Sequence, residues 1–149
     1  MKLFLAIFLL LTISESDIHT ARQLFLSAGN QKQKANDLLQ LSQNKSQSEN
    51  IFEGYRGVAF MMMAKYSLNP FQKLKLFNKG KSIFENAISK DSMNIELRYL
   101  RLAVQSNTPG FLGYTYAIES DRKYLSQNMI RISDIELKNL VSDLLTETK

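Results

Sequence analysis

The chain of 149 residues contains no cysteine. It therefore has no disulfide, no thiolate metal site, no cysteine nucleophile and no processed N-terminal cysteine that would carry a lipid anchor. Histidine is nearly absent as well: His19 is the only one, and no group near it in the sequence would complete a metal site or a general-base pair. We expect His19 to be a surface residue of a helix.

Motifs that identify a reaction are also lacking. The sequence has no phosphate-binding loop, no Gly-x-Ser-x-Gly turn, no His-Glu-x-x-His helix and no acidic calcium loop. Glu119 and Asp121 lie too close along the chain to be assigned separate acid and base roles. We therefore expect no catalytic residues, no metal and no cofactor, with a small hydrolase as the remaining enzymatic alternative.

A short apolar run follows a single positive charge at the N-terminus. Lys2 precedes an apolar stretch that ends at Ile13, after which the chain turns polar. This pattern is typical of a secretory signal peptide, because about ten apolar residues are fewer than the roughly 20 that cross a bilayer. We expect a signal peptide over residues 1–16, cleavage after Ser16, and one mature domain over residues 17–149 without a transmembrane segment. An N-terminal membrane anchor and a buried first helix are the alternatives.

Basic residues outnumber acidic ones, with 19 Lys and Arg against 14 Asp and Glu and a net charge of +5. In an exported protein this balance favours an anionic envelope surface or an acidic protein as partner over nucleic acid. A small exported domain without disulfides suits a bacterial periplasm better than an animal extracellular space. We expect a periplasmic or secreted bacterial protein, monomeric or weakly oligomeric, that binds a protein or peptide of the cell envelope and no nucleic acid.

Apolar residues recur at helical spacing from Asp17 onward, and no segment alternates as a strand would. In Asn69-Pro70 and again in Thr108-Pro109, a capping residue precedes a proline that fits the first turn of a helix. We expect an all-α fold of about seven helices. They cover residues 17–29, 31–43, 51–66, 70–89 and 94–105, a sixth helix that starts at 109, and a last helix that starts at 133.

Two of these helices carry more specific signals. In the last helix, Ser133 and Glu136 form a capping box, and Ile132 and Leu137 close a hydrophobic staple over it. The helix over residues 70–89 has an apolar stripe that we expect to face the core. Its members are Leu74, Phe77, Phe84, Ala87 and Ile88.

The region around this fourth helix has a recognisable pattern of small and aromatic residues. Gly80, Phe84 and Ala87 supply a small residue, an aromatic and a second small residue, and Gly57 precedes an aromatic at Phe60. This pattern resembles the tetratricopeptide repeat. The resemblance implies antiparallel helical hairpins stacked as a short solenoid or irregular bundle, in which small residues let paired helices approach closely.

The chain also departs from that repeat. Glu53 and Arg56 stand where the motif has tryptophan and leucine, and Ser92 replaces the usual proline. The spacing from Gly57 to Gly80 exceeds that of a standard unit by roughly three helical turns, which would splay or extend the hairpin. The expected fold is therefore tetratricopeptide-like.

A second pattern consists of short segments between Tyr55 and Leu125. They are Tyr55-Arg-Gly57, Ala64-Lys-Tyr66, Asn69-Pro70, Lys73-Leu-Lys-Leu-Phe77, Asn94-Ile-Glu-Leu-Arg-Tyr-Leu-Arg101 and Pro109-Gly-Phe-Leu-Gly-Tyr114. In combination they resemble a family of small exported bacterial helical proteins without an assigned biochemical role. The resemblance implies a helical fold and export, and it implies no activity.

Candidate partner-binding residues cluster on the expected helix over residues 94–105. Arg98, Arg101 and Gln105 are spaced i, i+3 and i+7, so they share one face. Two guanidinium groups one turn apart form a clamp for a carboxylate or a phosphate, and the concave side of a solenoid would bring Arg56 and Lys65 near them. We predict that these five residues bind a peptide, a protein segment or an envelope component.

Tyr114 is the sixth candidate. It lies in a segment rich in glycine and aromatic residues, where Phe111, Leu112 and Tyr114 would line a peptide groove. Packing against the preceding helix explains Phe111 and Leu112 equally well, so Tyr114 is the preferred contact.

The alternative is a purely structural or assembly role in the cell envelope. Carboxylates inside the domain would then neutralise the two arginines of the stripe, and the aromatic residues would only hold the hairpins together. The carboxylates considered for this role are Glu96, Asp91 and Glu53.

Overall fold

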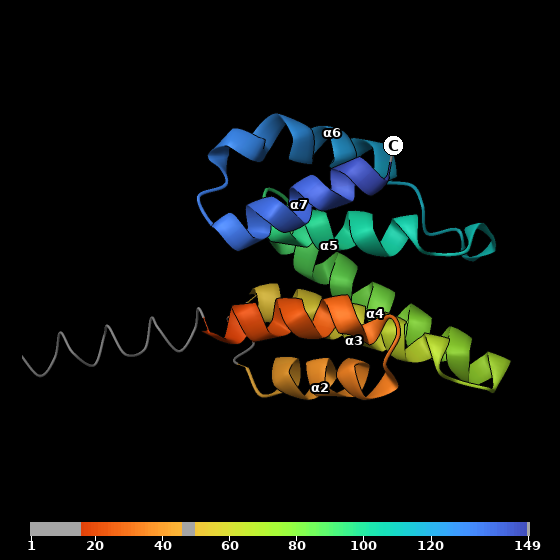
Figure 1. Ribbon diagram of the computed structural model, residues 1–149. Coiled ribbons are helices and arrows are strands. Elements are labelled where there is room, and N and C mark those ends of the chain that lie inside the picture. The colour runs from red at the N-terminus through yellow and green to blue at the C-terminus, as the bar shows by residue number, and fades with distance from the viewer. Residues whose placement is uncertain (1–15, 46–49, 149) are drawn as a thin grey trace, which may run out of the picture. The chain divides into compact units, whose positions relative to one another are not determined.

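The computed structural model describes residues 16–45 and 50–148 (Figure 1). All of the regular structure in these residues is helical, which confirms the expected all-α fold of about seven helices. The predicted signal peptide lies outside the described residues except for Ser16. The helices are 16–28, α2 (Lys32–Gln43), α3 (Asn50–Lys65), α4 (Pro70–Lys90), α5 (Ile95–Ser106), α6 (Ile118–Asn128) and α7 (Ile135–Glu147), with 3₁₀ turns η1 (Gly110–Leu112) and η2 (Met129–Arg131).

The chain divides into two compact units, Met1–Glu85 and Asn86–Lys149. The first unit contains helix 16–28, α2, α3 and most of α4, and the second contains the rest of the described chain. In the first unit α2 packs against α3, and Phe52 and Tyr55 of α3 are completely covered. In the second unit α5, α6 and α7 pack against one another (Figure 1).

Two glycines bring α3 and α4 into direct backbone contact. A Cβ atom added to Gly57 would lie 2.6 Å from the Phe84 amide nitrogen and 2.8 Å from the Gly80 carbonyl oxygen. A Cβ atom on Gly80 would lie 2.7 Å from the Met61 amide nitrogen and closer still to the Gly57 oxygen. Since main-chain atoms of a packed helix cannot rotate away, only glycine fits at these two positions. The small residues that the sequence places here therefore do let the paired helices approach closely.

Asparagine side chains fix the starts of α4 and α5, and the cap at Asn69 was expected. Asn69 Oδ1 accepts hydrogen bonds from the amides of Phe71 (2.9 Å) and Gln72 (3.1 Å), and Asn94 Oδ1 accepts from Leu97 N (3.0 Å). Each bond satisfies an amide that has no partner within the helix.

The expected start of the sixth helix at Pro109 is wrong. Thr108 does not cap a new helix, because its hydroxyl donates to the Val104 carbonyl of the preceding one (2.7 Å). After Pro109 the chain makes only the single turn η1, which stops at Gly113 in the left-handed conformation with φ 62°. The helix α6 begins nine residues after Pro109, at Ile118.

The expected capping box of the last helix is also wrong. The capping side chain belongs to Asp134, which accepts from Leu137 N at 3.0 Å, so Ser133 lies one residue outside the helix. Asp and Ser cap equally well, and the extended backbone at Asp134 decides between them. In the apolar stripe of α4, Phe77, Phe84, Ala87 and Ile88 are buried as expected, whereas Leu74 is half exposed.

We expect Gly80→Ala to lower the free energy of unfolding by about 1–3 kcal/mol, because the new methyl group pushes the backbones of α3 and α4 apart. Urea unfolding followed by circular dichroism measures the change. Gly29→Ala is the matched control, since a Cβ atom there meets nothing within 4 Å. Equal stability of the two variants would contradict the contact.

Candidate functional site

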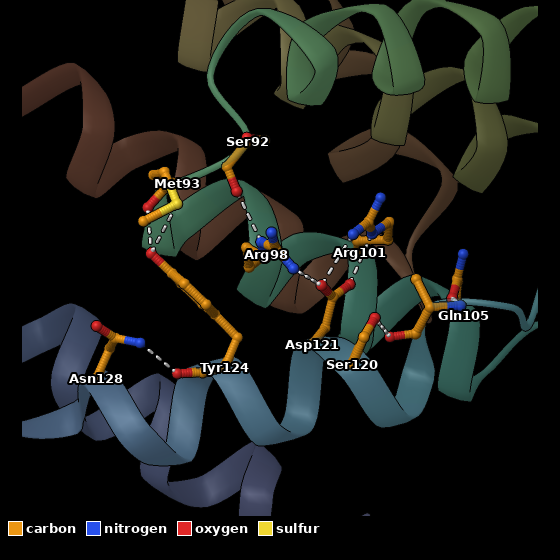
Figure 2. A network of polar contacts seen from close by, with 10 residues as sticks. Ser92, Met93, Arg98, Arg101, Gln105, Ser120, Asp121, Tyr124 and Asn128 are labelled. Atoms are coloured by element: carbon orange, nitrogen blue, oxygen red, sulfur yellow. Dashed lines mark hydrogen bonds and ion pairs between the residues drawn. The ribbon is translucent and has the colours of Figure 1, made fainter.

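The two arginines of the predicted stripe converge on one carboxylate of α6 (Figure 2). Arg101 binds Asp121 with two hydrogen bonds, Nε to Oδ2 at 2.6 Å and Nη2 to Oδ1 at 2.9 Å. Arg98 Nη1 donates to the same Oδ1 at 2.9 Å. Asp121 has no exposed surface, so both arginines neutralise a fully desolvated charge.

Aromatic rings cover the outer faces of these arginines. The guanidinium of Arg98 lies 4.4 Å from the ring centre of Tyr124, and that of Arg101 lies 5.8 Å from the ring centre of Tyr116. Arg98 Nε also donates to the Ser92 carbonyl (2.8 Å), and the Tyr124 hydroxyl donates to the neighbouring Met93 carbonyl (2.9 Å), as Figure 2 shows. These contacts hold the start of α5 against α6.

The carboxylate that pairs with the arginines is not one that the sequence singled out for that role. Asp91 accepts from the side chain of Asn94 (3.0 Å), and Glu53 accepts from Arg56 (3.3 Å). Glu96 is buried on the same helix as the arginines.

A signal for the real partner is present in the sequence once α6 is placed correctly. Ala117, Asp121 and Leu125 follow one another at intervals of four residues and are all buried. A carboxylate on an apolar helix face requires a cationic partner elsewhere in the fold.

Gln105 and Tyr114 are internal as well. Gln105 Oε1 accepts from the backbone amide of Ala117 (3.0 Å), which ties the end of α5 to the start of α6, while its Nε2 is buried without a hydrogen bond. Tyr114 is completely covered and packs edge-on against Tyr116, with ring centres 6.0 Å apart. Arg101, Gln105 and Tyr114 are therefore buried in the second unit, and Arg98 is partly buried beside them.

The other two candidates belong to the first unit. Arg56 forms an ion pair with Glu53 one turn earlier on α3, with 3.3 Å between Nη2 and Oε1. The ammonium group of Lys65 donates to the Gly29 carbonyl. His19 lies exposed on helix 16–28, as expected for a surface residue.

The segment between α5 and α6 carries exposed aromatic residues that the sequence did not favour. We call residues 107–117 the aromatic loop. Phe111 is 87% exposed and Tyr116 is 64% exposed, while Tyr114 between them is buried. The ends of the loop are fixed by the Thr108 hydroxyl on Val104 and by the Ala117 amide on Gln105.

A shallow pocket of about 440 Å³ lies near the end of the described chain in the second unit. Arg122 lines it, donates to Glu119 (2.6 Å) and to the Thr148 carbonyl, and has a buried Nε without a hydrogen bond. The lining residues are Ser106, Asn107, Ile118, Arg122, Leu144, Glu147 and Thr148. They include no histidine to act as a base for the hydroxyl groups of Ser106 or Thr148.

The described part of the chain contains neither a metal-binding cluster nor a membrane-spanning helix. No three of its His, Asp and Glu side chains are grouped so that they would hold a metal ion. None of its helices combines the length and the apolar character needed to cross a membrane.

We expect Arg101→Glu to destabilise the protein by about 3–5 kcal/mol, because it removes the two-bond partner of Asp121 and places a second carboxylate beside it. Thermal and urea unfolding measure the loss. Arg131→Glu makes the same charge change at an exposed site and should stay within about 0.5 kcal/mol of the wild type. If Arg101→Glu were as stable as this control, the ion pair with Asp121 would not contribute to the fold.

Comparison of the chain with models of protein families, with curated proteins and with solved structures gives no match. The resemblances to the tetratricopeptide repeat and to a family of exported helical proteins therefore stay predictions.

Proposed function

We propose that this chain is an exported, non-catalytic helical protein that binds a peptide or protein segment of the cell envelope through the aromatic loop. The observation that carries the proposal is the exposure of Phe111 and Tyr116, at 87% and 64%, on a loop with both ends fixed by hydrogen bonds. Large aromatic side chains contribute much of the affinity at protein interfaces.

Fixed loop ends favour binding for an entropic reason. A loop that is already ordered loses little conformational freedom when a partner arrives, so more of the contact energy appears as affinity. Tyr and Phe add to this advantage, because each provides a large contact area with only two side-chain torsions. Phe111 and Tyr116 are thus assigned to direct contact with the partner.

The six residues predicted from the sequence take supporting roles in this proposal. Arg101 lies beneath the ring of Tyr116, Gln105 holds the Ala117 amide, and Tyr114 packs against Tyr116. Arg98 donates to Asp121 and so helps to hold α6 against α5 at the ends of the aromatic loop. Arg56 and Lys65 lie in the first unit, where they bond to Glu53 and to the Gly29 carbonyl, and they are assigned no role in the aromatic loop.

A tetratricopeptide-like hairpin formed by α3 and α4 is part of the same proposal. The backbone contact between Gly57 and Gly80 supports it, because close helix pairing through small residues is the packing that such repeats use. Under this proposal, the hairpin acts as a rigid scaffold and the aromatic loop supplies the contact surface.

A purely structural role in the envelope is the second candidate. It is favoured by the burial of Arg101 and Gln105, which are engaged with Asp121 and Ala117 inside the second unit. The two candidates differ in what they require of Phe111 and Tyr116, since only a binding module needs their exposed surface.

Export is proposed on the N-terminal pattern alone, and the first described turn is compatible with it. Asp17 forms an ion pair with Lys45, beyond the end of α2. Cleavage after Ser16 would leave this ion pair in place and keep the described fold of the first unit.

We expect the protein recovered from the exported fraction to begin at Asp17, because signal peptidase would remove residues 1–16. Intact-mass spectrometry of that fraction measures the N-terminus. A product that keeps Met1 and sediments with the inner membrane would contradict export as a cleaved protein.

We expect the double variant Phe111→Ser/Tyr116→Ser to weaken peptide binding by at least about tenfold, which corresponds to about 1.4 kcal/mol. A random-peptide phage library is panned on the immobilised protein, and the dissociation constants of the enriched peptides are measured by isothermal titration calorimetry. Unfolding temperatures should fall only modestly, since both side chains are mostly exposed and only Tyr116 also contacts Arg101 and Tyr114.

The matched control is Ile130→Ser, which removes an equally exposed apolar side chain (89%) from the same unit. Enriched peptides should bind this variant as they bind the wild type. Failure to enrich any peptide, or equal weakening by the control, would favour the structural role.

A further inference from the structure

One end of the first unit is formed by two chain turns that lie side by side (Figure 1). The Tyr66 hydroxyl donates to the Ala28 carbonyl (2.5 Å), and the Lys65 ammonium donates to the Gly29 carbonyl. These bonds join the turn after helix 16–28 to the turn between α3 and α4. We call the surface of residues 26–34 and 65–75 the turn end.

The turn end carries large apolar side chains that are exposed to water. All residues from 68 to 75 are exposed, so the first turn of α4 has no covered side. Leu68 is fully exposed, Phe71 is 84% exposed and Leu74 is 48% exposed. Single exposed apolar residues are common at protein surfaces, but three within seven residues form a patch that indicates an interaction surface.

The same surface is strongly basic. Residues 26–34 and 65–75 include five lysines and no Asp or Glu. The nearest acidic residue along the chain is Asp37, which accepts a hydrogen bond from Gln33 (2.8 Å). Lys73 and Lys75 alternate with the exposed apolar residues of α4.

The net positive charge of the chain is concentrated in the first unit. Residues 17–85 contain ten Lys and Arg against five Asp and Glu, a net +5, whereas residues 86–149 contain eight of each, a net charge of zero. An anionic partner is therefore attracted to the first unit and not to the aromatic loop in the second.

We infer that the turn end docks on an anionic phospholipid surface. Leu68 and Phe71 enter the headgroup layer, and Lys73 and Lys75 remain at the level of the lipid phosphates. This combination of apolar and basic groups is what binds proteins to the plane of a membrane interface. Because the apolar side chains stand on an uncovered turn, a protein partner would have to supply a pocket for them, whereas a lipid surface requires none.

This surface is distinct from the one that binds a protein segment in the proposed function. It depends on that proposal only through export, since an uncleaved apolar leader would itself bind lipid. The protein is therefore taken from the exported fraction, and its N-terminus is verified by mass before use, so that failure of export and failure of lipid docking give different results.

The sequence contains no tryptophan, which makes a fluorescence test direct. In Phe71→Trp the only indole stands at the turn end, and in Phe111→Trp it stands on the aromatic loop at a similarly exposed site. Vesicles of phosphatidylglycerol and phosphatidylcholine should shift the Phe71→Trp emission to shorter wavelength, and brominated acyl chains should quench it. The emission of Phe111→Trp should stay unchanged.

Cosedimentation with the same vesicles tests each part of the surface. We expect Leu68→Ser/Phe71→Ser and Lys73→Glu/Lys75→Glu each to lower the bound fraction, with apparent affinities reduced by at least about tenfold. Ile130→Ser and Lys138→Glu, the matched exposed changes in the second unit, should bind as the wild type does. Binding should fall with added salt and be absent with phosphatidylcholine alone.

Several results would overturn the inference. They are equal binding to neutral vesicles, full binding by the turn-end variants, and an unchanged Phe71→Trp spectrum. Binding to polyglutamate without binding to anionic vesicles would assign the surface to an acidic polypeptide instead. If a double variant unfolds, the single change Lys75→Glu, which is fully on the surface, replaces it in the comparison.

Discussion

The buried carboxylate of Asp121 is the constraint on which the second unit depends. A carboxylate without any exposed surface is tolerated only when cationic donors saturate it, and Arg98 and Arg101 reach it with three hydrogen bonds. Both arginines come from α5 and the carboxylate comes from α6, so the pair fixes the register between these helices. As a consequence, the two ends of the connection between α5 and α6, residues 107–117, are held in place.

This arrangement separates the residues that organise the aromatic loop from those that meet solvent. Gln105 and Tyr114 lie below the surface, and Phe111 and Tyr116 lie above it. A polar network of this kind is costly to bury and gives a unique geometry when every strong contact is made. The first unit uses a different device, since its tightest contact is between the main chains of α3 and α4 at Gly57 and Gly80.

The fold class and most helix boundaries were predictable because their signals are local. Periodicity gave the helices, and the side chains of Asn69 and Asn94 marked two of the starts. The start of α6 was missed because Thr108 resembles a cap in the sequence, while its hydroxyl in fact bonds back to Val104. Ser133 and Asp134 are adjacent and equally good caps, so only the backbone conformation distinguishes them.

The sequence predicted which residues of α5 share a face, and it did not predict what covers that face. Helical spacing correctly placed Arg98, Arg101 and Gln105 on one face, but spacing along one helix does not reveal what covers that face. The covering carboxylate comes 20 residues after Arg101, on the helix with the misplaced start. The exposure of Phe111, against the burial of Tyr114 only three residues later, likewise follows from the turn η1 and from Gly113, which periodicity does not describe.

The crossing of α3 and α4 has a consequence for the evolution of this chain. The atoms that crowd Gly57 and Gly80 are mostly main-chain atoms, so a smaller side chain at Phe84 or Met61 would not make room for a larger residue at either glycine. Lineages that keep this crossing should therefore retain both glycines, 23 positions apart, while the surrounding helix surfaces drift. That fixed pair, together with the aromatic residue at Phe84, provides an anchor by which distant descendants of the same ancestor would be recognised.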